Sequence, residues 1–290
     1  AQLSRGLGDV YKRQVIVIIF AHIPLGMLPH LGNKIWALRA TSDRVRFIWM
    51  AAVFALTLSM MGLGGLLSRA YFGSDLLSGV GNPNQALPLL FIEIFPTWLA
   101  ALIGVGILSA VMSTADGLVI SSSQIIANDL YRKTYVARKK INMSDAKIDN
   151  NVLKISSVST VVILISCAFF AQALINKNVA LIVWIGIGGM MAAFSGPLII
   201  GALWRGVTRR GAYAGLISGM GTFIILHAQL LDPLWFEDSS VVQNITGWLI
   251  KQGPNPFACT FLGEIVSVFT TILVSKFSAK LPREHLDQMF

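Results

Sequence analysis

Charged side chains are scarce in this sequence. Asp, Glu, Lys and Arg make up 13% of the 290 residues, whereas about a quarter of a soluble domain is charged. Hydrophobic residues make up 54%, and the mean hydropathy is +0.68. The charges that are present lie in short clusters between long apolar runs. This balance excludes an ordinary soluble domain and predicts an integral membrane protein.

Cysteine is also rare, since Cys167 and Cys259 are the two in the chain and each lies in or beside an apolar run. Two such residues indicate neither a disulfide framework nor a metal site. No cluster of nucleophile, base and orienting residue is present, so we expect neither an enzyme nor an organic cofactor. Gly186, Gly188 and Gly189 lie within an apolar helix, which favours helix packing over a nucleotide-binding loop.

The apolar runs predict the membrane topology, because a helix needs about 20 such residues to cross the hydrocarbon core. The run from Val15 to Leu31 is interrupted by Pro24, Gly26 and Pro29 and predicts a broken helix. Full spans are expected at Phe47–Leu67, Thr97–Ile126, Leu153–Leu174, Val179–Leu203, Ala212–Leu231 and Phe257–Val274, with a short amphipathic helix within Asn84–Phe95.

The two ends of the chain are expected to differ from this transmembrane domain, which we assign to residues 15–281. Residues 1–14 are polar and show no apolar periodicity. They predict a non-native leader, with a native extramembrane loop as the alternative. Residues 282–290 are expected to form a cytoplasmic tail.

The basic residues predict the orientation in the membrane. The net charge is +9, but Lys and Arg lie in loops beside the spans and form no continuous basic face, which disfavours nucleic acid as a partner. If the spans alternate, one side gathers Lys34, Arg39, Arg44, Arg46, Arg132, Lys133, Arg138, Lys139, Lys140, Lys147, Lys154, Arg205, Arg209, Arg210, Lys276, Lys280 and Arg283. The positive-inside rule places that side and the C-terminus in the cytoplasm of a multi-pass protein of the cell (inner or plasma) membrane.

One face of the expected helix from Thr97 combines small and hydroxyl-bearing residues. Ala110, Ser113, Thr114, Gly117 and Ser121 follow the spacing of a single helical face. Two interpretations stay open. Small residues, Ser and Thr line helix contacts in membranes generally. Adjacent hydroxyls beside the Ala110 carbonyl also offer the oxygen ligands that a hard cation prefers.

Four stretches resemble the sodium:solute symporter family. The segment ILSAVMSTADGLVISSSQIIANDLYRK, residues 107–133, is similar to its signature helix. Gly26 to His30 resembles its Gly-Met-Pro-His turn with Leu28 inserted, and Asn84 to Pro96 resembles the helix before the signature span. Leu203 to Gly215 resembles the basic Gly-Ala-x-Ala-Gly junction of the family.

The resemblance implies an all-α transporter fold of the LeuT type, built from two inverted repeats. By this likeness the chain comprises the second repeat and C-terminal helices, and it begins in the second half of a broken helix. The family pattern assigns sodium to the Ala110 carbonyl and to the Ser113 and Thr114 hydroxyls. The remaining ligands would come from the first repeat, in an N-terminal half that this sequence lacks.

Further candidate residues follow from the same resemblance. Asp116 stands where some family members hold a second sodium ion, although Gly117 offers no hydroxyl there; a solvated or paired carboxylate is the alternative. His22 in the broken helix and Trp184 and Gly188 on a later span are candidates for the substrate pathway, with helix packing or lipid contact as the alternatives. Glu264, in the last span, is expected to face a neighbouring helix or the interface.

The resulting hypothesis is a secondary active transporter that couples sodium influx to uptake of a small organic solute, such as proline or pantothenate, by alternating access. Its expected partners are sodium, that solute, the lipid bilayer and the missing N-terminal half. The alternative is a membrane sensor, because the same module resembles the input domain of some histidine kinases. A long kinase region encoded after Phe290 would favour the sensor.

Overall fold

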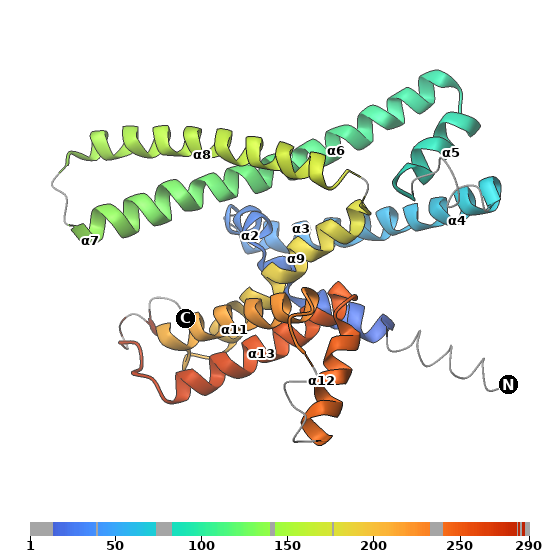
Figure 1. Cartoon of the computed structure of the whole chain (residues 1–290). Coiled ribbons are helices and arrows are strands. Elements are labelled where there is room, and N and C mark those ends of the chain that lie inside the picture. Colours follow the sequence, from blue (N-terminus) through green and yellow to red (C-terminus); the bar gives the residue numbers. More distant parts are fainter. Residues whose placement is uncertain are drawn as a thin grey trace. The chain divides into compact units, whose positions relative to one another are not determined.

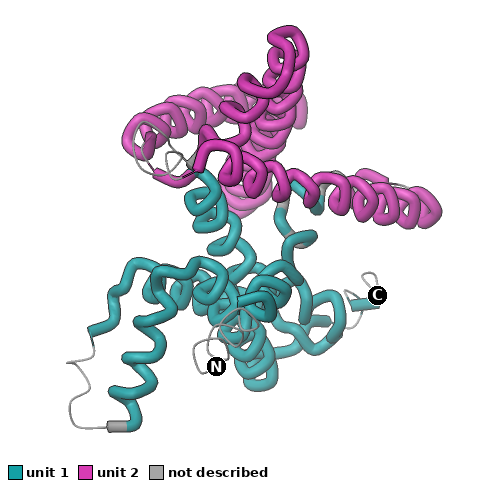
Figure 2. The backbone as a smooth tube through the Cα atoms, turned by 90° about the vertical axis from the view of Figure 1, so that its right-hand side faces the viewer, with its two compact units in different colours: residues 1–32, 179–290 teal, residues 33–178 magenta. Residues whose placement is uncertain are grey.

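The computed structural model describes residues 14–38, 40–73, 83–139, 143–175, 177–232, 240–282, 284 and 286–287. Within these ranges every regular element is a helix. The chain divides into two compact units, residues 33–178 and residues 1–32 with 179–290 (Figure 2). Most of the expected leader and tail lies outside the described residues, as do Arg39, Lys140 and Arg283 of the basic side.

The unit of residues 33–178 is a set of long helices with short connections. Its elements are α3 (Thr41–Ser59), α4 (Met61–Phe72), η3 (Pro83–Gln85), α5 (Ala86–Ile94), α6 (Thr97–Gln124), η4 (Ile125–Val136), α7 (Ala137–Lys139) and α8 (Asp145–Ala173). Gly73 ends α4 with a φ of 63°, a backbone conformation that suits glycine. The Ser68 hydroxyl donates to the Ala86 carbonyl at 2.8 Å and so ties α4 to α5.

Helices α6 and α8 lie side by side and are joined by polar contacts at one end (Figure 1). Arg132 pairs with Asp149 at 3.0 Å, and the Asn151 amide donates to the Tyr131 hydroxyl at 2.9 Å. Both contacts start from η4, a π-helix that continues α6. They fix the position of the end of α6 against the first turns of α8.

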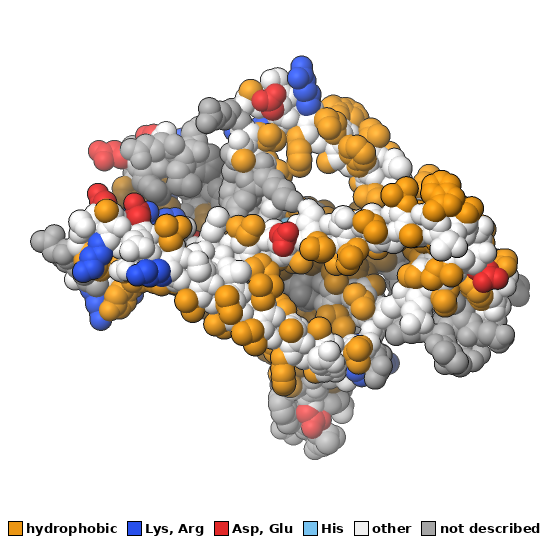
Figure 3. Space-filling view, turned by 90° about the horizontal axis from the view of Figure 1, so that it is seen from above, with side chains coloured by type: hydrophobic (Ala, Val, Ile, Leu, Met, Phe, Trp, Pro, Cys, Tyr) orange, Lys and Arg blue, Asp and Glu red, His pale blue; other side chains and the backbone are white. Residues whose placement is uncertain are grey.

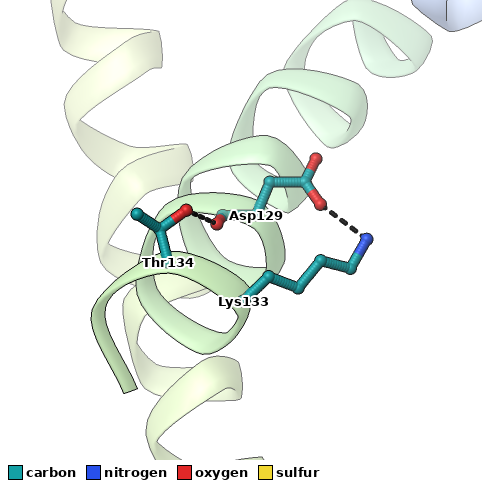
Figure 4. Close-up of polar contacts among 3 residues, drawn as sticks. All are labelled: Asp129, Lys133 and Thr134. Carbon is teal, nitrogen blue, oxygen red and sulfur yellow. Dashed lines mark hydrogen bonds and ion pairs between the residues drawn. The ribbon is translucent and has the colours of Figure 1, made fainter. Parts of the chain in front are cut away.

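The wider turn of η4 is reflected in its own side chains (Figure 4). The Thr134 hydroxyl donates to the Asp129 carbonyl at 2.7 Å, five residues back, which is the spacing that a π-helix brings together. On the outside of the same turn, Lys133 pairs with the Asp129 carboxylate at 2.8 Å. Both Lys133 and Asp129 are exposed, so this ion pair contributes little to stability.

The second unit contains the broken helix and the C-terminal helices. A helical segment at 14–21 precedes η1 (Ile23–Met27), α2 (Pro29–Trp36), α9 (Val179–Phe194), η5 (Ser195–Ile200), α10 (Gly201–Leu203), α11 (Arg209–His227), α12 (Ser240–Gln252) and α13 (Pro256–Lys276). The interruption predicted at Pro24, Gly26 and Pro29 is therefore confirmed as a 3₁₀ turn followed by a new helix.

A seam of small residues joins α11 to α13, which lie side by side (Figure 1). Gly211, Gly215 and Gly219 recur at every fourth position of α11 and face Ser275, Thr271 and Ser267 of α13. A Cβ atom at Gly215 would meet the Thr271 hydroxyl and the Ser267 carbonyl oxygen. Lipid provides no hydrophobic force between helices, so this close backbone approach supplies the packing.

Ser267 also hydrogen-bonds backbone groups beside Pro197 of η5, where proline interrupts the backbone hydrogen bonds of the helix. Proline lacks the N–H that would normally bond the carbonyl four residues back, here that of Ala193. The Ser267 hydroxyl donates to the Ala193 carbonyl at 3.3 Å instead, and it accepts the Gly196 N–H at 3.1 Å. One hydroxyl of α13 thereby satisfies two backbone groups that the π-turn leaves open.

Within the described ranges, five helical segments are long and apolar enough to cross a membrane: Thr41–Phe72, Thr97–Lys139, Asp145–Ala173, Val179–Leu203 and Pro256–Lys276. The expectation of six full spans is wrong on this criterion. The sixth, expected at Ala212–Leu231, corresponds to α11, whose glycines and two arginines lower its hydropathy. Because α11 is covered by α9 and α13, it does not need an apolar surface all round.

Apolar side chains are spread along the helices in Figure 3, and the Lys and Arg side chains in view gather mainly at its left end and its top. On α3 no residue is buried, and Trp49 and Phe54 are among its exposed side chains. In a soluble protein such a surface would aggregate. It is the surface expected of helices that face lipid or other membrane helices.

The seam makes a testable distinction between neighbouring glycines of α11. A Cβ at Gly219 would meet the Ala192 carbonyl oxygen and lie 2.8 Å from the Ser267 Cβ, whereas a Cβ at Gly221 has nothing within 4 Å. Gly219→Ala should therefore destabilise the protein by about 1–3 kcal/mol through overpacking. Gly221→Ala should be neutral or stabilise by up to about 1 kcal/mol through helix propensity. Thermal unfolding in detergent measures both, and equal shifts would refute the seam.

Candidate functional site

The residues expected to bind sodium lie together on α6. Ala110, Ser113 and Thr114 are all exposed within their unit, and the Thr114 hydroxyl donates to the Ala110 carbonyl at 3.2 Å. Two of the three expected ligand oxygens are therefore neighbours in space. The Ser113 hydroxyl lies on the adjacent residue and makes no hydrogen bond within the described part of the chain.

This arrangement can supply one side of a cation site. A hard cation prefers oxygen ligands. Because Na⁺ carries a single charge, neutral hydroxyl and carbonyl oxygens can bind it without a carboxylate. The three oxygens here come from a single helix surface, which cannot surround an ion. The other ligands must come from a second element, and the exposure of this face leaves room for one.

The face predicted from the sequence changes character along α6. Ala110, Ser113 and Thr114 are exposed, Gly117 is half-buried and Ser121 is buried. Near Ser121, the buried Ser123 hydroxyl lies 3.5 Å from the Ser156 hydroxyl of α8. Helix packing therefore accounts for the Ser121 end of the face, whereas the Ser113 and Thr114 end is exposed in the part of the chain that the structure describes.

Asp116 lies half a turn beyond Thr114 and is exposed. Among the described residues it makes no ion pair, and a Cβ at the neighbouring Gly117 would have nothing within 4 Å. The carboxylate is thus free to meet another group beside the α6 face. Its role in a second ion site stays a prediction.

In the other unit, two of the expected substrate-pathway residues are in contact. The His22 ring meets the Trp184 ring edge-on at 4.4 Å between centroids. Its Nδ1 lies 2.5 Å from the Ile18 carbonyl oxygen, which orients the imidazole. His22 caps η1 and Trp184 belongs to α9, so the break in the first helix is what brings the two rings together.

Phe257 completes this aromatic cluster and was not predicted. Its ring lies 4.6 Å from that of Trp184 and 6.1 Å from that of His22. The Asn255 side chain accepts the N–H groups of Phe257 and Ala258 and starts α13 at this point. The Asn-Pro-Phe sequence is a helix-start signal that would have located Phe257 on the first turn.

Gly188, the third expected pathway residue, lies one turn after Trp184 and is buried. A Cβ there would meet the Thr260 hydroxyl and lie 3.3 Å from the Phe223 ring, while Gly189 lies against Phe223 and Met220. Helix packing, predicted for the glycines of this segment, is confirmed for Gly188 and Gly189 but not for Gly186, which has nothing within 4 Å.

Comparison with known proteins identifies relatives of this chain. The family model of the sodium:solute symporter family matches residues 10–219. The chain is 29% identical over 204 residues to a sodium/pantothenate symporter of Haemophilus influenzae, covering 69% of this chain and 39% of that protein. It is 29% identical over 207 residues to a sodium/proline symporter of Escherichia coli, covering 68% of this chain and 38% of that protein.

A longer match is to a sodium/proline symporter of Staphylococcus aureus, 29% identical over 278 residues, which are 96% of this chain and 47% of that protein. The chain thus spans less than half the length of these relatives. No solved structure matches the chain. With more than half of its residues matched by one family model, this chain belongs to the sodium:solute symporter family.

Proposed function

We propose that this chain is part of a transporter that couples sodium influx to the uptake of a small organic solute. The observation that carries the proposal is the α6 face, where the Thr114 hydroxyl and the Ala110 carbonyl lie 3.2 Å apart beside Ser113. The face belongs to the region matched by the family model, whose members named above are symporters.

The coupling follows from how such an ion is held. Sodium on the α6 face needs ligands from a second element, which by family likeness is the broken helix of a first inverted repeat in a LeuT-type fold. Binding of the ion therefore holds two elements together and stabilises one gate state. Solute that binds the same state is then carried by alternating access.

The aromatic cluster supports a proposal for the solute. His22, Trp184 and Phe257 offer apolar ring surfaces with one ring nitrogen that can exchange a hydrogen bond. This surface suits a compact solute with an apolar body and a polar group. Proline, the solute named for the Escherichia coli relative, combines an apolar ring with polar groups in this way.

Loss of a ligand hydroxyl should raise the sodium concentration that uptake needs. Ser113→Ala and Thr114→Ala each remove one oxygen from a buried cation, at a cost of about 1.5–3 kcal/mol. This corresponds to a weakening of roughly 10- to 150-fold in apparent sodium affinity. Maximal uptake should fall less, because saturating sodium still fills the site. The measurement is initial uptake of proline or pantothenate against sodium concentration in cells expressing the whole gene.

Two serines of α6 provide matched controls. The Ser109 hydroxyl is exposed and donates to the Val105 carbonyl at 2.8 Å, the same four-residue bond that Thr114 makes, but one turn before the Ser113 hydroxyl. Ser121 is buried on the packed end of the face. Ser109→Ala and Ser121→Ala should leave sodium dependence unchanged. A uniform response in all four variants would assign Ser113 and Thr114 to packing.

We further propose that the loop between Arg132 and Lys154 lies in the cytoplasm, as does the C-terminus of this multi-pass protein. Ser144, which precedes α8 and is exposed, is a suitable position for a cysteine. Ser144→Cys should resist a membrane-impermeant thiol reagent in intact cells and react after permeabilisation, because the basic residues around it resist translocation.

For this experiment, the native cysteines must not react with the thiol reagent. Cys167 is exposed and must be replaced, for example by Cys167→Ser, whereas Cys259 is buried. Lys177→Cys, in the exposed turn between α8 and α9, is the matched control for the opposite side and should react in intact cells. The reverse pattern would invert the topology.

A further inference from the structure

Glu264 is an acidic residue that is buried within the apolar part of α13. The residue is 7% exposed, and its Oε1 atom has no hydrogen-bond partner among the residues that the structure describes. The residue occupies a middle turn of a helix long and apolar enough to span the membrane. A carboxyl group in such a place needs a physical explanation, because an isolated buried carboxylate is unfavourable.

The carboxyl group lines an open groove of about 360 Å³. The other lining residues are Phe20, Ile23, Pro24, Ser195, Ile199, Phe261, Ile265, Val268, Phe269 and Ile272. Apart from Glu264, the groove offers the Ser195 hydroxyl as its one polar side chain, and that hydroxyl donates to the Ala192 carbonyl at 3.3 Å. The groove is thus an apolar surface with a single acidic group.

The helices around α13 bring no basic group to this groove. The residues of η1, η5 and α9 include no titratable side chain, and His22, which caps η1 and contacts Phe257, does not line the groove. The titratable residues of α11 lie near its ends, at Arg209, Arg210, Tyr213 and His227, and α12 contributes Lys251. None of these residues lines the groove.

The oxygens available in the groove favour a proton over a metal ion. Among the described residues, the lining offers the carboxyl group and one hydroxyl, fewer oxygens than sodium needs, so a sodium ion there would require ligands from another part of the protein. A proton needs a single oxygen and neutralises the carboxylate without any further ligand. We propose that Glu264 is a proton-binding site in the membrane interior, distinct from the sodium ligands of α6.

Carbodiimide labelling tests this proposal without relying on transport. Dicyclohexylcarbodiimide partitions into membranes and reacts with a protonated carboxyl group, which adds across the reagent to leave a stable N-acylurea. In membranes from cells expressing the whole gene, the peptide that contains Glu264 should gain the mass of the reagent at neutral pH and severalfold less at alkaline pH. The exposed Glu284 should gain severalfold less at neutral pH.

Amide substitution gives a second, independent measurement. Glutamine has the shape and neutrality of a protonated glutamate, so Glu264→Gln should abolish labelling of this peptide and leave the thermal unfolding temperature unchanged. Glu264→Ala leaves an empty volume and should lower it. A Glu264→Gln protein as unstable as Glu264→Ala would indicate an ionised carboxylate with a partner and overturn the proposal. Labelling that sodium suppresses at constant pH would also overturn it, in favour of a metal ion.

Discussion

The approach of α11 to α13 is the contact on which the packing of the second unit depends. Glycine at every fourth residue of α11 admits the hydroxyl side chains of α13 close to its backbone. The same side chains then satisfy backbone groups elsewhere: Ser267 bonds the Ala193 carbonyl and the Gly196 N–H just before Pro197, and Ser275 accepts the Thr208 N–H at 3.1 Å. Packing and hydrogen bonding in this unit therefore rest on one row of small residues, and a larger residue in that row would disturb both.

Hydroxyl groups inside the membrane have two different structural roles in this chain. On α13 they are buried and used by neighbouring helices, as at Ser267 and Ser275. On α6 the hydroxyl of Thr114 turns back to its own helix, and its face remains exposed. A hydroxyl bonded only within its helix makes no tertiary contact, as the Ser109 hydroxyl of α6 also illustrates. The sodium-ligand role of Ser113 and Thr114 therefore stays a prediction.

Hydropathy and proline positions predicted the helices well, because lipid requires each span to satisfy its own backbone. The interrupted first helix, the helix after Asn84 and the glycine packing of α9 at Gly188 and Gly189 followed from local sequence. Features that depend on contact with a partner helix could not be predicted from the local sequence. The glycines and two arginines of α11 made its hydropathy too low for the span that was expected there, and the contact of Phe257 with Trp184 joins residues far apart in the sequence. The π-turns also escaped prediction, since no residue pattern distinguishes them from α-helix.

The length of α8 has a consequence for the lipid around it. Its 29 residues extend about 43 Å at 1.5 Å per residue, whereas the hydrocarbon core is about 30 Å thick. The excess falls in the polar first turns, which contain Lys147 and Lys154 and bond to Arg132 through Asp149. If the apolar turns of α8 cross the hydrocarbon core without strong tilt, the polar turns lie among the phospholipid headgroups, where basic side chains attract anionic lipids. The phosphatidylglycerol content of a bacterial membrane, or the phosphatidylserine content of a eukaryotic one, would thus set how firmly the ends of α6 and α8 are held at its surface.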